Sequence, residues 1–160
     1  MDKKCTIVTL KERPDLEDEF DKVHSIGWAK FMREDPIGAK YWDNLHSWFP
    51  EFQYILLNDE LTPMACGNSI PFDWDGNEDS LPSGWDGVFE KGILVYQDNI
   101  SPNSLSALAI VIHPKFRGKG LSELMVKEMK DLANKNRIKN MVAPVHPSLK
   151  VSTYSYGRIY

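Results

Sequence analysis

The sequence has few of the features that mark secreted, metal-binding or membrane proteins. Its 160 residues include two cysteines, Cys5 and Cys66, which are too few for a disulfide framework or a zinc site. No histidine pair has the spacing of metal ligands, no apolar run is long enough to cross a bilayer, and no apolar export signal follows Met1. We therefore expect one cytoplasmic domain that holds no metal, with both thiols reduced and buried.

Charge is distributed unevenly along the chain. Residues 1–100 contain 20 acidic and 9 basic side chains, and residues 101–160 contain 3 acidic and 10 basic ones. A basic C-terminal part suits a polyanionic ligand and an acidic N-terminal part suits a cationic one, although an uneven solvated surface would give the same count. The net charge of −4 and the lack of any recognised nucleic-acid module argue against a nucleic-acid partner.

The order of expected elements is that of a mixed α/β protein. Strands are expected at 5–10, 52–57, 64–72, 105–112 and 140–143, and helices from about residue 15, from residue 36, over 83–96 and over 121–132. Asp35 before Pro36, and Ser83 three residues before Asp86, are expected to cap two of these helices. The pattern predicts a mixed central sheet flanked by helices in a single domain, residues 1–160.

A glycine-containing loop follows the most apolar strand. Residues 105–112 are apolar at every position except Ser106, which is typical of a central strand covered on both faces. Gly118 and Gly120 then allow a sharp turn and a close backbone approach to a ligand. The helix that follows offers unpaired N–H groups and the positive end of its dipole, so the loop is expected to bind a phosphate.

Two common phosphate-binding motifs do not fit this loop. A Walker loop requires Lys-Ser or Lys-Thr after its last glycine, and that pair is missing. A dinucleotide fingerprint requires a third glycine, where this chain has Glu123, and an acidic residue at the end of the next strand, where it has Val142 and Ala143.

The remaining pattern is Arg-x-x-Gly-x-small, at residues 117–122. In this position it resembles the acetyl-CoA loop of the GNAT superfamily of N-acetyltransferases, and the strand order also agrees with that superfamily up to its fifth strand. Further likenesses, at 70–72, 81–85, 143–145 and 147–150, are to a bacterial GNAT subgroup. The resemblance covers most of the chain and is sharp from Leu105 to Lys150.

The resemblance implies acetyl-CoA as cosubstrate, held by residues 101–150, with residues 1–100 forming the acceptor side. The pyrophosphate would be bound by backbone N–H groups of Arg117, Gly118, Lys119, Gly120, Leu121 and Ser122. The strand edge formed by Ile110, Val111 and Ile112 would pair with the pantetheine, and a splay between this strand and residues 140–143 would admit the cofactor arm. A backbone N–H near Val111 or Ile112 would polarise the acetyl carbonyl.

The general base and general acid are less clear from the sequence. Acyl transfer to an amine requires a group that takes a proton, and residues 105–112 contain no carboxylate. The candidate bases elsewhere are Asp73, Asp75, Glu90 and His146, of which Asp73 is taken as the catalytic candidate. Tyr154 and Tyr156 are the candidates for the acid that protonates the departing thiolate. Ser122 also stands where the superfamily has Gly or Ala.

The C-terminal segment is expected to differ from the superfamily. Residues 151–160 are predicted to be a tail, so that the last two strands of a GNAT sheet would be missing and an edge would stay open. A partner chain in a homodimer would cover such an edge, or the sequence would be a shortened version of a longer protein.

The sequence therefore favours a GNAT-type acetyltransferase that moves an acetyl group from acetyl-CoA to an amine by direct attack in a ternary complex. The acceptor would be a small-molecule amine or a peptide amine, with no membrane partner. The alternative is a CoA-binding or interaction module that has lost turnover, because a clear base and the terminal strands are lacking. Cys66 as a nucleophile is disfavoured.

Overall fold

The computed structural model describes residues 4–145 and 157–159. These residues form a six-stranded sheet in the order β1-β2-β3-β4-β5-β6. The strands are β1 (Thr6–Thr9), β2 (Gln53–Leu57), β3 (Pro63–Phe72), β4 (Ser104–Ile112), β5 (Asn140–Val145) and β6 (Gly157–Ile159). Neighbouring strands are antiparallel except β4 and β5, which are parallel. The mixed α/β fold predicted from the sequence is confirmed.

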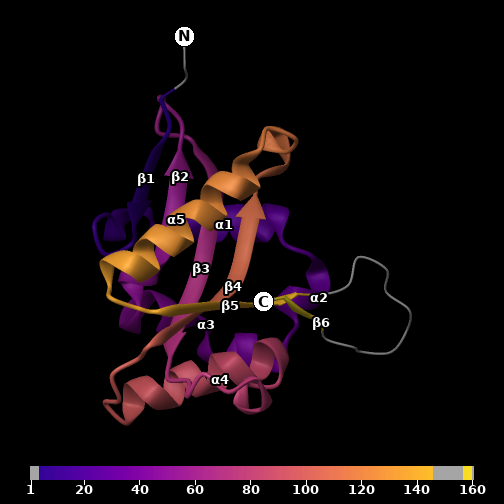
Figure 1. Cartoon of the computed structure of the whole chain (residues 1–160). Coiled ribbons are helices and arrows are strands. Elements are labelled where there is room, and N and C mark those ends of the chain that lie inside the picture. The colour runs from indigo at the N-terminus through magenta and orange to yellow at the C-terminus, as the bar shows by residue number, and fades with distance from the viewer. Residues whose placement is uncertain (1–3, 146–156, 160) are drawn as a thin grey trace.

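Helices cover both faces of this sheet (Figure 1). α5 (Leu121–Lys135) crosses one face, and α1 (Glu17–Gly27) lies on the opposite face. α3 (Pro36–Trp48) packs against α4 (Gly84–Gln97), which connects β3 to β4. The short helix α2 (Lys30–Arg33) joins α1 to α3, and 3₁₀ turns lie at Pro14–Leu16, Pro50–Phe52, Glu78–Ser80 and Pro114–Phe116. The four residues of α2 are too few to show a helical period, which is why the sequence did not predict it.

The two predicted helix caps have different outcomes. Asp35 caps α3, because its Oδ1 accepts a hydrogen bond from the Gly38 N–H at 2.8 Å. The prediction for Ser83 is wrong, since its side chain makes no capping hydrogen bond to α4. Gly84, the next residue, has φ of +66°, and this left-handed turn changes the direction in which the chain enters the helix.

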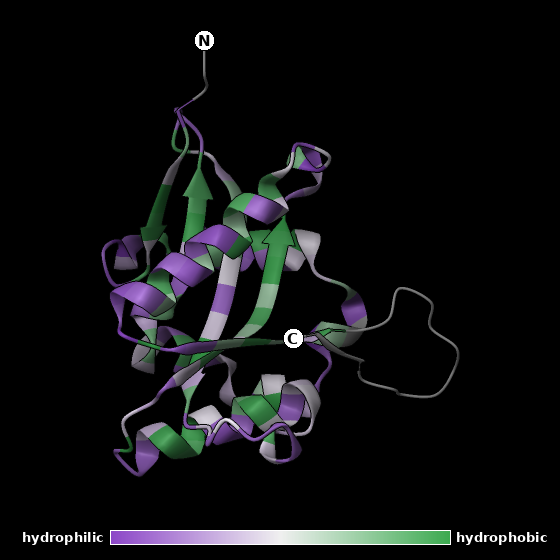
Figure 2. Ribbon diagram, viewed as in Figure 1, coloured by the Kyte–Doolittle hydropathy of each residue, from purple (hydrophilic) through white to green (hydrophobic). Residues whose placement is uncertain are grey.

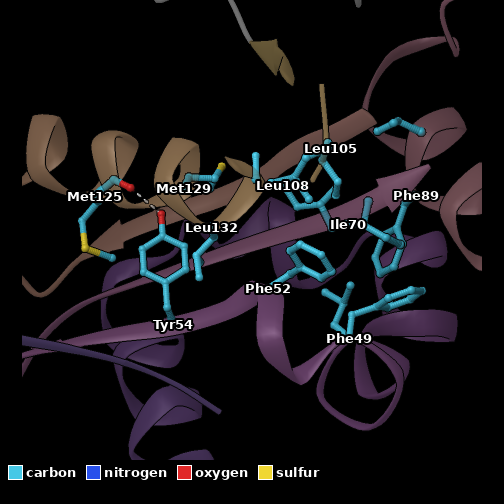
Figure 3. Close-up of a cluster of buried hydrophobic side chains, with 14 of the residues drawn as sticks. Phe49, Phe52, Tyr54, Ile70, Phe89, Leu105, Leu108, Met125, Met129 and Leu132 are labelled. Atoms are coloured by element: carbon cyan, nitrogen blue, oxygen red, sulfur yellow. Dashed lines mark hydrogen bonds between the residues drawn. The ribbon is translucent and has the colours of Figure 1, made fainter. Parts of the chain in front are cut away.

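The buried face of α5 is tied to the sheet by Tyr54 of β2. The Tyr54 side chain is fully buried and donates a hydrogen bond of 2.5 Å to the Met125 carbonyl of α5 (Figure 3). Gly67 of β3 makes room for this ring, because a Cβ at residue 67 would lie 2.2 Å from Tyr54 Cζ. Burial raises the pKa of the Tyr54 hydroxyl, which therefore stays a donor. This contact fixes α5, and with it the loop that precedes α5, relative to the strands.

The helix expected over residues 121–132 is confirmed as α5, and most of its apolar side chains face the sheet. Met125, Met129 and Leu132 are buried, whereas Leu124 is 37% exposed. Figure 2 shows that the outward side of α5 is largely hydrophilic. The helix is therefore amphipathic and packs on the sheet through one face.

The C-terminal segment differs from the expectation of a tail. Gly157–Ile159 form β6 and pair with β5, with Ala143 opposite Ile159 and Val145 opposite Gly157. This part of the β5 edge is therefore covered by the chain itself, which removes the argument that a partner chain must cover it there. Three residues are too short for a strand to be recognised from sequence, because their pairing comes from β5.

No helix within residues 4–145 is both long and apolar enough to cross a bilayer. The same part of the chain, with residues 157–159, holds no group of three or more His, Cys, Asp or Glu side chains arranged to bind a metal ion.

Candidate functional site

β4 has a free edge over the second half of its length. It pairs with β5 only from Ser104 to Ser106, which lie opposite Asn140 to Val142. Beyond Ser106 the two parallel strands are no longer paired, as the sequence-based expectation of a splay required. The backbone groups of β4 on this side are therefore available to a ligand.

The direction of the free N–H groups follows from a hydrogen bond at the end of β4. The His113 N–H donates to the Met64 carbonyl at 2.9 Å, so it points toward β3. Backbone groups alternate in direction along a strand, so the Val111 N–H also points toward β3, whereas those of Ile110 and Ile112 point toward the free edge. Of the three edge residues predicted, Ile110 and Ile112 thus offer N–H groups to a ligand and Val111 does not.

A β-bulge lies between the paired part and the free part of β4. Asn68 of β3 pairs with Ala109, and Ser69 pairs with Ala107, so Leu108 is an extra residue without a partner in β3. The Leu108 carbonyl instead accepts a hydrogen bond of 2.8 Å from Trp85 Nε1. A bulge bends its strand and increases the local twist, which here coincides with the point at which β4 leaves β5.

The two glycines of the loop after β4 have backbone conformations that other residues adopt with strain. Gly118 has φ of +74° and Gly120 has φ of +73°. A Cβ built at either position would have no atom within 4 Å, so both glycines border open space. Gly120 is also the N-cap of α5 and provides no side chain that could bond the first N–H groups of the helix. These N–H groups therefore face the open space and can bind an anion.

A cavity of about 430 Å³ joins the free edge of β4 to this loop. Its lining includes all the residues predicted to bind the cofactor except Lys119, namely Ile110, Val111, Ile112, Arg117, Gly118, Gly120, Leu121 and Ser122, together with Gly27, Trp28 and Phe116. Lys119 lies at the rim, with its ammonium 5.3 Å from the centre of the Phe116 ring. The open space, the helix terminus and the basic rim have the size and charge that suit a phosphate-bearing ligand.

Arg117 acts differently from the sequence-based expectation. Its backbone N–H bonds to the Pro114 carbonyl within a turn, at 3.4 Å, and is therefore not free for a ligand. Its guanidinium donates to the carbonyls of Gly27, at 3.2 Å, and Ile112, at 3.4 Å. The side chain thus connects the end of α1 to the end of β4 at the mouth of the cavity.

Gly27 and Trp28 were not predicted as part of this loop site. Gly27, the last residue of α1, lies so close to β4 that a Cβ there would be 2.5 Å from Val111 Cγ1. The half-buried ring of Trp28 follows and packs against Trp42, with ring centres 4.7 Å apart. Trp28 also lines the cavity beside β4. The available signal was the glycine itself, since a residue without a Cβ allows two backbones to approach closely.

The candidate general bases that the structure describes do not line this cavity. Asp73 is half-buried just beyond the end of β3, where Phe72 pairs with Ser104 of β4. Ser104 is six residues before Ile110, or about 20 Å along the strand, so Asp73 lies far from the cavity. Asp75 accepts hydrogen bonds from the Ser80 hydroxyl and the Asn77 N–H, and both lower the pKa of its carboxyl. Asp75 therefore stabilises its own loop. The third candidate, Glu90, is exposed on α4.

Of the other catalytic candidates, the structure describes Cys66 alone. His146, Tyr154 and Tyr156 lie outside the residues that the structure describes. Cys66 is buried in β3, where burial raises the pKa of its thiol well above the ordinary value, so the thiolate needed of a nucleophile is disfavoured. The expectation that both thiols are buried is wrong for Cys5, which is exposed.

Comparison with known proteins identifies one relative by sequence and several solved structures by fold. No family model matches the chain. The chain is 30% identical over 158 residues to the arginine N-acetyltransferase avaD of Aspergillus versicolor, an alignment that covers 91% of this chain and 54% of that protein. It thus spans about half the length of this curated relative.

Solved structures show the same fold at lower identity. The loading GNATL domain of CurA from Lyngbya majuscula has a TM-score of 0.61 and 15% identity, over 88% of this chain and 64% of that one. The GNAT family N-acetyltransferase YhbS from Escherichia coli, in complex with CoA, has a TM-score of 0.60 and 17% identity, over 93% of this chain and 67% of that one.

Proposed function

We propose that this chain, which has the fold of the GNAT N-acetyltransferases, transfers an acetyl group from acetyl-CoA to an amine. The observation that carries the proposal is the single cavity in which the free edge of β4 meets the glycine loop at the start of α5. A pyrophosphate needs the N–H groups of the loop, and an extended amide-bearing arm needs an unpaired strand edge. Both are within one cavity of this chain.

The chain's own residues have distinct parts in this proposal. Gly118, Gly120 and the first turn of α5 hold the pyrophosphate, while the backbone groups of Ile110 and Ile112 pair with the pantetheine arm. Acetyl-CoA supplies the activated acetyl thioester. The N–H of Ile112 or Ile110, rather than that of Val111, is placed to stabilise negative charge on the carbonyl oxygen when an amine attacks. Direct attack in a ternary complex requires no covalent enzyme intermediate.

The proposed acceptor is a small cationic amine, and arginine is the first to test. The curated relative is named for arginine, and residues 1–100 of this chain carry 20 acidic against 9 basic side chains. An acidic acceptor side would concentrate a cationic substrate.

Binding is tested by titration calorimetry with acetyl-CoA. Gly120→Glu places a carboxylate beside the proposed pyrophosphate and is expected to weaken binding about tenfold or more. Gly76→Glu is the matched control, because Gly76 also has a positive φ of +84° and a Cβ there meets no atom within 4 Å. It introduces the same charge and a similar backbone strain in a loop away from the cavity, so it should bind as the parent does. Equal affinities for all three proteins would contradict the site.

Turnover is tested by thiol release from acetyl-CoA with arginine and a panel of other amines. One observation favours a second candidate function, that of a CoA-binding module without turnover: the described candidate bases all lie away from the cavity. Acetyl-CoA binding without thiol release for any amine would favour this second function. Release that depends on an amine, and that is lost in Gly120→Glu but kept in Gly76→Glu, would favour the acetyltransferase.

A further inference from the structure

The bulge in β4 separates the part of the strand that pairs with β5 from the part that lines the cavity. Ser106 is the last residue of β4 that pairs with β5, and Ile110 is the first that lines the cavity. Leu108, the extra residue of the bulge, lies between them and has no partner in β3. The conformation at Leu108 therefore decides in which direction the ligand-facing half of β4 runs.

The carbonyl of Leu108 is held from another layer of the fold. Trp85, in the first turn of α4, is 4% exposed and donates its indole N–H to the Leu108 oxygen at 2.8 Å. The indole has little freedom to move, because a Cβ at Gly38 of α3 would lie 3.3 Å from Trp85 Cη2. On another side the ring packs edge-on against Phe89, with ring centres 5.2 Å apart. The donor is thus fixed in place by α3 and α4.

We propose that Trp85 is a positioning residue of the acyl-CoA cavity: its indole N–H holds the Leu108 carbonyl and so keeps the second half of β4 apart from β5. The inference rests on the function proposed above. Without the indole N–H, the buried Leu108 carbonyl has lost its partner, and the strand gains by rotating that carbonyl toward another donor. Such a rotation straightens the bulge and changes the direction of the Ile110 and Ile112 N–H groups, which the pantetheine arm would need.

The sharpest perturbation removes the N–H and leaves the shape of the ring. Site-specific incorporation of β-(3-benzothienyl)alanine at residue 85 replaces the indole nitrogen with sulfur and keeps the ring volume, so folding is preserved. Trp85→Phe is a second, genetically simple variant. The matched control is the same analogue at residue 74, because Trp74 Nε1 also donates to a backbone carbonyl, that of Asn77 at 2.9 Å, but on the surface.

Two measurements distinguish positioning from a general loss of stability. The first is the dissociation constant for acetyl-CoA, which is expected to rise about fivefold or more in the residue-85 analogue and to stay unchanged in the residue-74 analogue. The second is amide hydrogen exchange, which should accelerate in residues 107–112 before it does elsewhere in the sheet. Ile55→Val, a buried substitution on the α1 face of the sheet, should lower stability and leave both readouts unchanged.

The outcomes are separable from those of the proposed function. The inference would be overturned if the protein with the analogue at residue 85 bound acetyl-CoA within twofold as tightly as the protein with the analogue at residue 74. Unchanged amide exchange in residues 107–112 of the residue-85 analogue would also overturn it. Failure of the parent protein itself to bind acetyl-CoA would overturn the proposed function. In that case the exchange measurement still decides whether Trp85 holds the bulge.

Discussion

Acidification from neutral pH to pH 4 should destabilise the protein through a single buried histidine. His24 of α1 is 5% exposed, and both of its ring nitrogens lack a hydrogen-bond partner in the described part of the chain. Its ring packs among aromatic side chains, with ring centres 5.1 Å from Phe20, 4.9 Å from Trp28 and 5.2 Å from Trp42. Burial lowers the pKa of His24 from 6.5 to about 4. Electrostatic repulsion by His46 adds to this shift, whereas the side chain of Asn68 opposes it.

The direction of the effect follows from where each state binds the proton. Between about pH 6.5 and pH 4 the unfolded chain protonates this histidine and the folded chain does not, so the free energy of unfolding falls as the pH falls. Above this range the residue is neutral in both states and contributes no pH dependence. A shift of this size corresponds to about 3 kcal/mol, all of it lost by pH 4.

The measurement is urea unfolding followed by tryptophan fluorescence at several pH values. Carboxylates also titrate in this range, so the quantity to compare is the difference between parent and His24→Phe. The variant should be as stable as the parent or more stable at pH 7, because it removes two unpaired nitrogens, and its advantage should grow by about 3 kcal/mol toward pH 4. Ile93→Val, a buried substitution on α4 without a titrating group, should show a constant difference. Parallel curves for the parent and His24→Phe would refute the reasoning.

Three further predictions concern elements that position the site, and urea unfolding checks each of them. Asp35→Ala removes the side-chain acceptor of the Gly38 N–H and should lower stability by about 1 kcal/mol, whereas Asp35→Asn, which keeps an acceptor, should not. Tyr54→Phe leaves the buried Met125 carbonyl without its donor and should cost about 1–3 kcal/mol; a neutral result would show that the hydrogen bond is dispensable. Gly67→Ala places a methyl group 2.2 Å from the Tyr54 ring and should cost about 1–3 kcal/mol or more. The double variant with Tyr54→Ala should recover part of that loss, and an additive loss would contradict the proposed clash.

The parts of the fold that could be predicted from the sequence are those set by local chemistry. The strand expected at 105–112 follows from its nearly unbroken apolar run, and the helix after it follows from the spacing of its apolar residues. Gly118 and Gly120 indicate the sharp turn between them, and both have a positive φ. The helix α2 and the strand β6 were not predicted, because each has too few residues for a period and depends on neighbours for its stability.

The remaining part of the site depends on the register of β4 against β3, which cannot be read from the residues of β4 alone. Whether Val111 or Ile112 presents its N–H to a ligand is decided by the pairing of β4 with β3, through the bond between His113 and Met64. A residue that is shifted by one position along a strand points to the other side. The sequence could therefore propose the edge but not the donor.

The free half of β4 needs support from other layers, since β5 no longer pairs with it. At its far end Arg117 connects the Ile112 carbonyl to that of Gly27, at the end of α1, and at its near end Trp85 of α4 holds the Leu108 carbonyl. A strand edge that is left open cannot be stabilised by another strand on that side, and here side-chain donors from α4 and from the loop after β4 satisfy the carbonyls at its two ends. Because Trp85 lies far from the loop in sequence, substitutions in α4 that touch no ligand should still alter ligand binding.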